Sequence, residues 1–159
     1  MTDPARDVRV RELAVHEMPR TDAVYDELRF ARSDPANTRM LCAESGGEMV
    51  GLGRLIDLGP RADDGSDDEG GARVLELGGI WVAESARRQG IAGRLVAGLL
   101  DLAPPDAEVW CLPFEDLLPL YAAHGFLVEP VDAAPAALEP RYRGCASEHE
   151  RRVVLTRLA

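Results

Sequence analysis

The chain has 159 residues and a formal net charge of −10 at pH 7, and its 18 basic residues are all arginine. This length suits one domain with a substantial hydrophobic core, and the acidic charge argues against nucleic-acid phosphates as the main partner. Three widely spaced cysteines, no apolar run of bilayer length and no signal-peptide pattern predict a reduced, cytoplasmic protein without membrane contact.

The first half of the chain predicts a strand, a helix and a β-hairpin. The helix is expected to begin at Thr21 or Asp22, since both side chains suit an N-cap, and to end before an Asp-Pro pair. The Ser-Gly-Gly-Glu tetrapeptide predicts a hairpin turn because glycine tolerates positive φ. The expected ranges are 8–15 for the first strand, 21–31 for the helix, and 39–44 and 49–58 for the hairpin strands.

Residues 60–72 are acidic and rich in glycine, which predicts a flexible loop. Their aspartates lack the Asp-x-Asp-x-Asp-Gly order and closing glutamate of a Ca²⁺ loop. No metal is therefore expected.

Residues 74–82 are apolar and β-branched and predict a strand, although the Gly78-Gly79 pair is unfavourable inside one. A β-bulge, or another chain lying close to the backbone, would explain the pair.

A helix is predicted over residues 91–102, and small residues open its first turn. The backbone N–H groups of a helix start have no intrahelical partner and lie at the positive end of the helix dipole. With Gly90, Ala92 and Gly93 there, and Arg87, Arg88 and Arg94 nearby, these donors predict a pyrophosphate site. The chain has no lysine, which excludes a Walker loop, and the glycines do not complete a Gly-x-Gly-x-x-Gly fingerprint.

The remaining chain predicts a strand parallel to 74–82, a second helix and two further strands. Gly125 stands where a glycine commonly follows a helix. The expected ranges are 108–112 for the parallel strand, 113–124 for the helix, 126–128 for the next strand, 131–149 for an irregular loop and 151–158 for the final strand.

Two motifs carry a resemblance to a known family. The segment Arg87-x-x-Gly90-x-Ala92 resembles the acyl-CoA signature of the GNAT superfamily of N-acyltransferases, and Leu120-Tyr121-x-x-x-Gly125-Phe126 resembles its second hallmark. The resemblance implies one α/β domain over 1–159. Its mixed, mostly antiparallel sheet would have six or seven strands with a splayed parallel pair and helices on both faces, and residues 131–149 would lie near the acceptor.

The resemblance also implies which residues bind the cofactor. Backbone groups in the gap beside the splayed strand would bind pantetheine, and the turn into the helix would bind the pyrophosphate. The Val82 N–H would stabilise the oxyanion. Many family members have Asn at the position of Phe114, where its side chain contacts the cofactor. In this chain that cofactor contact would differ or come from the backbone. The cofactor-binding residues are expected to be Ile80, Trp81 and Val82 for pantetheine, and Arg87, Arg88, Gln89, Gly90, Ile91, Ala92, Gly93 and Arg94 for the pyrophosphate.

Two residues are expected to be catalytic. Tyr121 would protonate the departing thiolate; on the helix pattern alone it is instead a half-buried core aromatic. Glu76 would be the base, by its match to a catalytic glutamate in histone-acetylating members. The alternatives are an outward-facing Glu76 paired with Arg73 or another arginine, and ordered water as the base.

The resulting hypothesis is an N-acetyltransferase that moves an acetyl group from acetyl-CoA to a primary amine by direct attack. The acceptor would be a small-molecule amine or an amine of a basic peptide or protein. The alternatives are a non-catalytic acyl-CoA-binding regulatory domain, another acyl donor, and an oxygen acceptor. A homodimer that pairs exposed final strands stays open.

Overall fold

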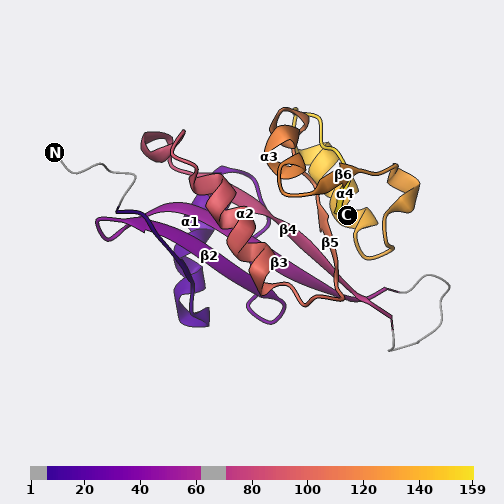
Figure 1. Ribbon diagram of the computed structural model, residues 1–159, viewed down its shortest axis with the longest axis horizontal. Helices are drawn as coiled ribbons and strands as arrows, with labels where there is room; N and C mark the ends of the chain where they lie inside the picture. Colours follow the sequence, from indigo (N-terminus) through magenta and orange to yellow (C-terminus); the bar gives the residue numbers. More distant parts are fainter. Residues whose placement is uncertain (1–6, 62–70) are drawn as a thin grey trace. The chain divides into compact units, whose positions relative to one another are not determined.

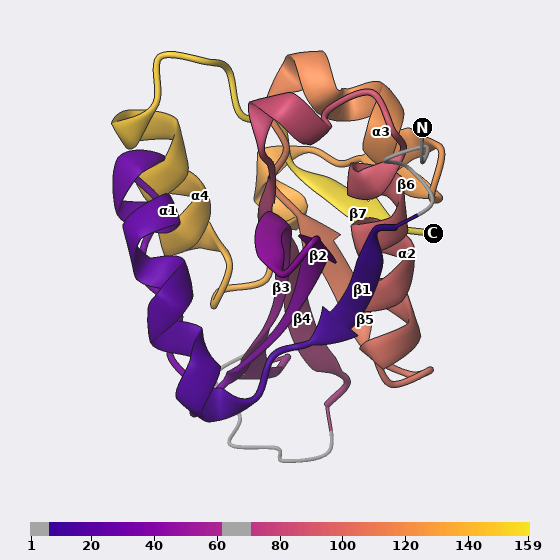
Figure 2. The same cartoon turned by 90° about the vertical axis from the view of Figure 1, so that its left-hand side faces the viewer.

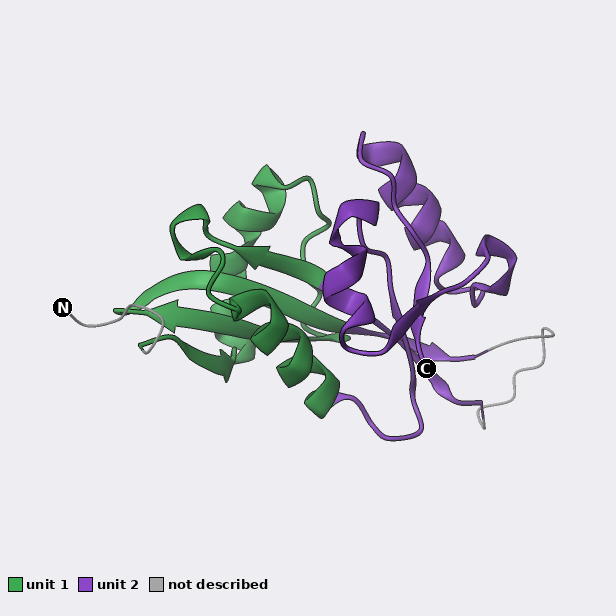
Figure 3. Ribbon diagram, turned by 45° about the horizontal axis from the view of Figure 1, so that its top comes forward, with its two compact units in different colours: residues 1–55, 79–102 green, residues 56–78, 103–159 purple. Residues whose placement is uncertain are grey.

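The computed structural model describes residues 7–61 and 71–159. They fall into two compact units, one with residues up to Leu55 and Gly79–Leu102, the other with Ile56–Gly78 and Ala103–Ala159 (Figure 3). Most of the predicted acidic loop, 60–72, lies outside the described residues.

The described residues form one sheet of seven strands in the order β1-β2-β3-β4-β5-β7-β6. Figure 1 labels the strands from β2 to β6. β4 and β5 are parallel, whereas β1–β2, β5–β7 and β6–β7 are antiparallel. This confirms the predicted mixed sheet with one parallel pair. The strands are β1 Arg9–Glu12, β2 Thr38–Ser45, β3 Glu48–Pro60, β4 Arg73–Val82, β5 Glu108–Cys111, β6 Phe126–Val128 and β7 Thr156–Leu158.

Among residues 7–61 and 71–159, four α-helices and four 3₁₀ helices connect the strands. The first α-helix begins where predicted, after the 3₁₀ helix that ends at Thr21, but it ends at Glu27 instead of Ala31, since Arg29 has a left-handed φ of 58°. Thr21 stands at the N-cap but does not cap: its hydroxyl donates to the Met18 carbonyl at 2.8 Å. The helices are η2 Val15–Thr21, α1 Asp22–Glu27, η3 Glu84–Ala86, α2 Ile91–Leu102, η4 Glu115–Leu117, α3 Leu118–Ala122, η5 Val131–Ala133 and α4 Glu139–Glu148.

In the first unit, α1 and α2 cover opposite faces of β1–β3 (Figure 2). The alternation of side chains along a strand sets this arrangement. Leu52 belongs to the cluster that contains Tyr25 of α1, whereas a Cβ on Gly51 or Gly53 would lie within 3.1 Å of side chains of α2. Two glycines therefore let α2 pack closely against β3.

Tyr25 connects α1 to the C-terminal half of β4. The residue is 0% exposed, and its hydroxyl donates to the Gly79 carbonyl at 2.9 Å. The Arg54 guanidinium lies 4.5 Å from its ring centroid and donates to the Ala31 carbonyl at 2.6 Å. Burial raises the pKa of the Tyr25 phenol, so it remains a neutral donor.

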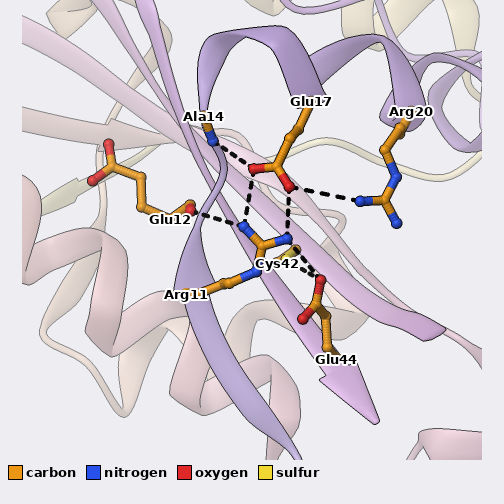
Figure 4. Close-up of polar contacts among 7 residues, drawn as sticks. All are labelled: Arg11, Glu12, Ala14, Glu17, Arg20, Cys42 and Glu44. Atoms are coloured by element: carbon orange, nitrogen blue, oxygen red, sulfur yellow. Dashed lines mark hydrogen bonds and ion pairs between the residues drawn. The ribbon is translucent and has the colours of Figure 1, made fainter. Parts of the chain in front are cut away.

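Charged side chains fasten η2 to the first two strands (Figure 4). Arg11 donates to both Glu17 oxygens at 2.8–2.9 Å and to Glu44 at 2.8 Å. The Ala14 amide also donates to Glu17, at 2.8 Å. The hydrogen bonds from Arg11 and then Ala14 lower the pKa of Glu17 from 4.5 to about 2.

In the second unit, Trp110 of β5 lies in a buried cluster with Val74, Leu138 and Leu155. Tyr142 of α4 packs against this cluster. Neighbouring residues on a strand point to opposite faces, so Cys111 faces away from the side that α4 covers.

Two expectations for the C-terminal region are wrong. Residues 131–149 are not an irregular loop, because they contain η5 and the ten-residue helix α4. Pro140 stands in the first turn of α4, where its missing N–H costs no intrahelical hydrogen bond. The final strand does not span 151–158: only Thr156–Leu158 is β7, and Val153 forms an isolated bridge with Phe114.

We expect Tyr25→Phe to destabilise the protein by about 1–2 kcal/mol, because the buried Gly79 carbonyl loses its donor while the ring stays in place. Urea unfolding monitored by circular dichroism measures the change. An unaltered unfolding midpoint would show that water replaces the phenol at no cost.

We expect Glu17→Gln to destabilise the protein at neutral pH and to have no effect near pH 2. Glu17 has a lowered pKa, so its stabilisation is complete above pH 4.5 and disappears as the pH falls toward about 2. Unfolding midpoints of both proteins between pH 2 and pH 7 test this. Glu27→Gln, at an exposed position in α1, is the control, and a pH-independent difference for Glu17→Gln would contradict the prediction.

Candidate functional site

The turn between β4 and α2 has an unusual backbone. Arg88 has φ 64° and Gly90 has φ 76°, both in the left-handed region. A non-glycine residue there stores strain, and such strain often marks a functional segment. A Cβ on Gly90 would meet no atom within 4 Å, so the turn is open on that side.

The open turn lies at the N-terminus of α2. The Arg94 amide donates to the Gly90 carbonyl at 3.1 Å, which makes this the first turn of the helix ladder. The N–H groups before Arg94 precede that ladder and have no partner within the helix. Donors of this kind bind anions. Residues 88–93 thus lie at the turn into α2, and their binding of a pyrophosphate stays a prediction.

Three arginines surround this helix start, and all three are exposed. Arg87 Nε donates to the Val82 carbonyl at 3.1 Å, and Arg94 Nη2 donates to the Val8 carbonyl at 3.0 Å. A guanidinium has five N–H donors, so each keeps further donors beyond these bonds. The hydrogen bonds hold the positive charges beside the turn.

Gly79, in the glycine pair of β4, combines a left-handed φ with a close neighbouring side chain. Gly79 has φ 60°, and a Cβ there would lie 2.6 Å from the Tyr25 hydroxyl. β4 pairs with β5 over Val74, Leu75, Glu76 and Leu77, and the half-buried Ile80, Trp81 and Val82 follow that paired segment.

Glu76 is buried at 6% exposure, and Arg141 Nε of α4 donates to its carboxylate. Arg73 pairs instead with Asp57, at 2.8 Å. The alternative of an outward-facing Glu76 paired with Arg73 is therefore wrong, whereas pairing with another arginine is observed. In the register, Glu76 lies opposite Trp110 and shares its face of the sheet.

Tyr121 of α3 is buried at 4% exposure, not half-buried. Its ring makes an edge-on contact with Phe126, with centroids 6.0 Å apart. Burial, followed by its contact with the Cys111 thiol, raises the pKa of Tyr121 well above the ordinary value. Tyr121 is thus a neutral phenol near neutral pH.

Cys111 lies beside Tyr121 and is fully buried. Burial raises the pKa of its thiol well above the ordinary value, so it is a neutral thiol rather than a nucleophile. Because Tyr121 contacts Cys111 whereas Glu76 shares the face of Trp110, the two catalytic candidates lie on opposite faces of the β4–β5 pair.

Phe114 packs against two side chains from the segment before β7. The Arg151 guanidinium lies 4.0 Å from its ring centroid, and the His149 ring makes an edge contact at 5.2 Å. Backbone bonds on both sides attach this segment to the chain before β7, from the Glu115 amide to the Arg152 carbonyl and from the Val154 amide to the Pro113 carbonyl. Its side chain offers no hydrogen bond to a ligand.

All the cofactor-binding candidates lie in the first unit, whereas Tyr121 and Glu76 lie in the second (Figure 3). Sequence reasoning missed Arg141, because it treated residues 131–149 as a loop. The Glu-Pro pair at the start of α4 was the available signal, since it favours a helix start.

Two general features of the described residues bear on function. Within 7–61 and 71–159, no cluster of three or more His, Cys, Asp or Glu side chains is arranged to hold a metal ion. Over the same residues, no helix has both the length and the apolar character required to cross a bilayer.

Solved structures resemble this chain in fold. N-acetylglutamate synthase from Neisseria gonorrhoeae, complexed with coenzyme A and N-acetyl-glutamate, aligns with TM-score 0.65 and 19% identity over 96% of this chain and 35% of its own. The present chain therefore spans about a third of that protein. Arabidopsis thaliana NAA60 with acetyl-CoA aligns with TM-score 0.65 and 12% identity over 94% and 97% of the two chains.

A third similar structure is Arabidopsis thaliana Naa50 bound to the bisubstrate analogue CoA-Ac-MVNAL, with TM-score 0.64 and 15% identity over 96% and 99% of the two chains. No curated protein sequence gave a significant match. The model of the Acetyltransferase (GNAT) family matches residues 6–126, which include both sequence motifs. The protein therefore belongs to the GNAT acetyltransferase family.

Proposed function

We propose that this protein is one N-acetyltransferase domain over residues 1–159 that transfers an acetyl group from acetyl-CoA to a primary amine. The observation that carries the proposal is the open, arginine-flanked turn at the N-terminus of α2. Its small residues, its left-handed glycine and its leading N–H groups fit a diphosphate.

The cofactor would be held by main-chain groups. The amides of residues 88–93 would bind the pyrophosphate, with the charges of Arg87, Arg88 and Arg94 around them. The backbone of Ile80, Trp81 and Val82 would bind the pantetheine arm, because these residues follow the segment of β4 that pairs with β5.

Acetyl-CoA supplies an activated thioester carbonyl. A neutral amine forms a C–N bond to that carbon, the C–S bond breaks, and the proton lost by nitrogen balances the thiol formed. The Val82 N–H would donate to the carbonyl oxygen as negative charge develops there. No covalent bond to the protein is required.

Tyr121 would act on the departing sulfur, and Glu76 would act on the attacking nitrogen. Tyr121 remains protonated because burial raises its pKa, so it can donate a hydrogen bond to the departing sulfur. Glu76 would draw the amine proton, directly or through water. Their positions on opposite faces of the β4–β5 pair would separate the entering nitrogen from the leaving sulfur.

One observation favours a second candidate, a non-catalytic acyl-CoA-binding domain. The Glu76 carboxylate is bound to Arg141 and is thus engaged rather than open to an amine. Such a domain would bind coenzyme A and release no thiol with any amine. The use of another acyl donor, or of an oxygen acceptor, is decided by mass analysis of the products.

We expect Tyr121→Phe to lower kcat by roughly 100-fold while the Kd for acetyl-CoA stays unchanged, because only the departing sulfur loses a donor. Free-thiol release with a panel of amines measures kcat, and calorimetry measures Kd. Tyr142→Phe, at a half-buried tyrosine of α4, is the control. Wild-type protein that binds acetyl-CoA yet releases no thiol with any amine would support the non-catalytic candidate.

We expect Gly90→Ala to destabilise the protein by about 1–2 kcal/mol, because alanine at φ 76° is strained. The turn should relax away from this geometry and raise the Kd for coenzyme A by at least about fivefold.

Gly144→Ala is the matched control, since this glycine lies inside α4 and a Cβ there meets no atom within 4 Å. It should gain up to about 1 kcal/mol and leave the Kd unchanged. An unchanged Kd in Gly90→Ala would contradict the assigned pyrophosphate site.

A further inference from the structure

The carboxylate of Glu76 is isolated from water. The side chain of Glu76 is 8% exposed. The same face of the β4–β5 pair also carries Val74 and Trp110 of the buried cluster. A carboxylate in such surroundings is stable as an anion only with a cation bound to it. While it is ionised, Glu76 therefore requires one positively charged partner.

Arg141 supplies that charge. Its side chain is 31% exposed, whereas the Glu76 side chain beneath it is 8% exposed. The guanidinium thus contacts the carboxylate while part of the same side chain reaches water. Moving Arg141 aside would leave the carboxylate able to accept another cation without any change in the strands.

The helix that carries Arg141 is held mainly at its start. Leu138, just before α4, is fully buried, and Tyr142 is half-buried against the Trp110 cluster. No residue within α4 itself is buried. Displacement of the Arg141 side chain, or of the later turns of α4, would consequently expose little apolar surface.

We infer that Glu76 forms a cation-binding subsite for the acceptor and that Arg141 is its internal, replaceable occupant. The ligand class is a primary alkylammonium or alkylguanidinium on an unbranched carbon chain. Exchange of one cation for another keeps the buried charge balanced. It therefore costs far less free energy than leaving the carboxylate buried without a partner. This inference rests on the proposed function for its role in acyl transfer.

The subsite restricts which acceptors the protein takes. An acceptor would approach as a cation, displace Arg141 and place its amine beside the carboxylate that draws the proton. A neutral or anionic group cannot replace the guanidinium, because it would leave the charge of Glu76 unbalanced. Selection therefore favours cationic amines of the lysine side-chain or polyamine type.

The first test is Arg141→Ala, measured by thermal shift with n-propylguanidinium and n-propylammonium as probes. We expect each cation to raise the Tm of this variant by roughly 3–6 °C at about ten times its Kd. The wild-type protein, whose subsite Arg141 occupies most of the time, should shift by only about a third as much at the same concentration. Propionamide, a neutral molecule of similar size, should have no effect.

The matched control is Arg143→Ala, on the same helix but 76% exposed at its side chain and paired with Glu139. It should behave as the wild type does. The double variant Glu76→Gln with Arg141→Ala should lose the response to cations. An equal shift in the Arg143 variant, or no shift in a folded Arg141 variant, overturns the inference.

Loss of Arg141 removes a buried charge partner, so the alanine variant can fail to fold. Arg141→Met then keeps the aliphatic bulk, and refolding with n-propylguanidinium becomes the measurement. Recovery of native circular dichroism with the cation, but not with propionamide, supports the subsite. No recovery with either compound overturns it.

Kinetics connect the subsite to acyl transfer. The KM for an alkylamine acceptor should fall by roughly tenfold in Arg141→Ala if the guanidinium occupies Glu76 about 90% of the time. n-Propylguanidinium should compete with the amine in this variant. Absence of turnover in every protein would refute the proposed function alone, since the thermal shifts report the subsite without any reaction.

Discussion

The buried carboxylate of Glu76 on β4 needs a cation as its partner while it is ionised. The packing of α4 and the proposed acceptor subsite in the second unit both depend on that ion pair. Glu76 lies among apolar side chains, and Arg141 donates to it from α4. The same pairing explains why a helix with no buried residue lies against this part of the sheet. A charge that must be paired selects its partner more strictly than an apolar surface does.

The first unit shows the same principle with a neutral group. Gly79 has a left-handed φ within β4, and the phenol of Tyr25 donates to its carbonyl. A buried acceptor that lacks a donor is costly, so a fully buried tyrosine has a clear role there. α1 is thereby attached to the backbone that precedes Ile80, Trp81 and Val82.

The helix start at α2 depends on small side chains and helix geometry instead. Gly90 supplies the left-handed φ, and the ladder of α2 begins only at Arg94. The exposed arginines add charge, but the main-chain N–H groups provide the geometry. The chain thus has two different charge arrangements. At the start of α2, main-chain N–H donors are available to an anion, whereas the buried carboxylate of Glu76 is paired with Arg141.

The sequence alone predicted the features that arise from neighbouring residues. The strand-turn-helix of residues 74–102, the hairpin glycines and the glycine after α3 follow from local φ preferences and side-chain size. Tertiary structure decided the pairing of Glu76 with Arg141, 65 residues away, and of Tyr25 with Gly79, 54 residues away. It also made a helix of residues 139–148, which the sequence analysis expected to be irregular. These features escape local patterns because burial creates them: only when the chain is folded do a carboxylate and a carbonyl lose water and require partners from distant segments.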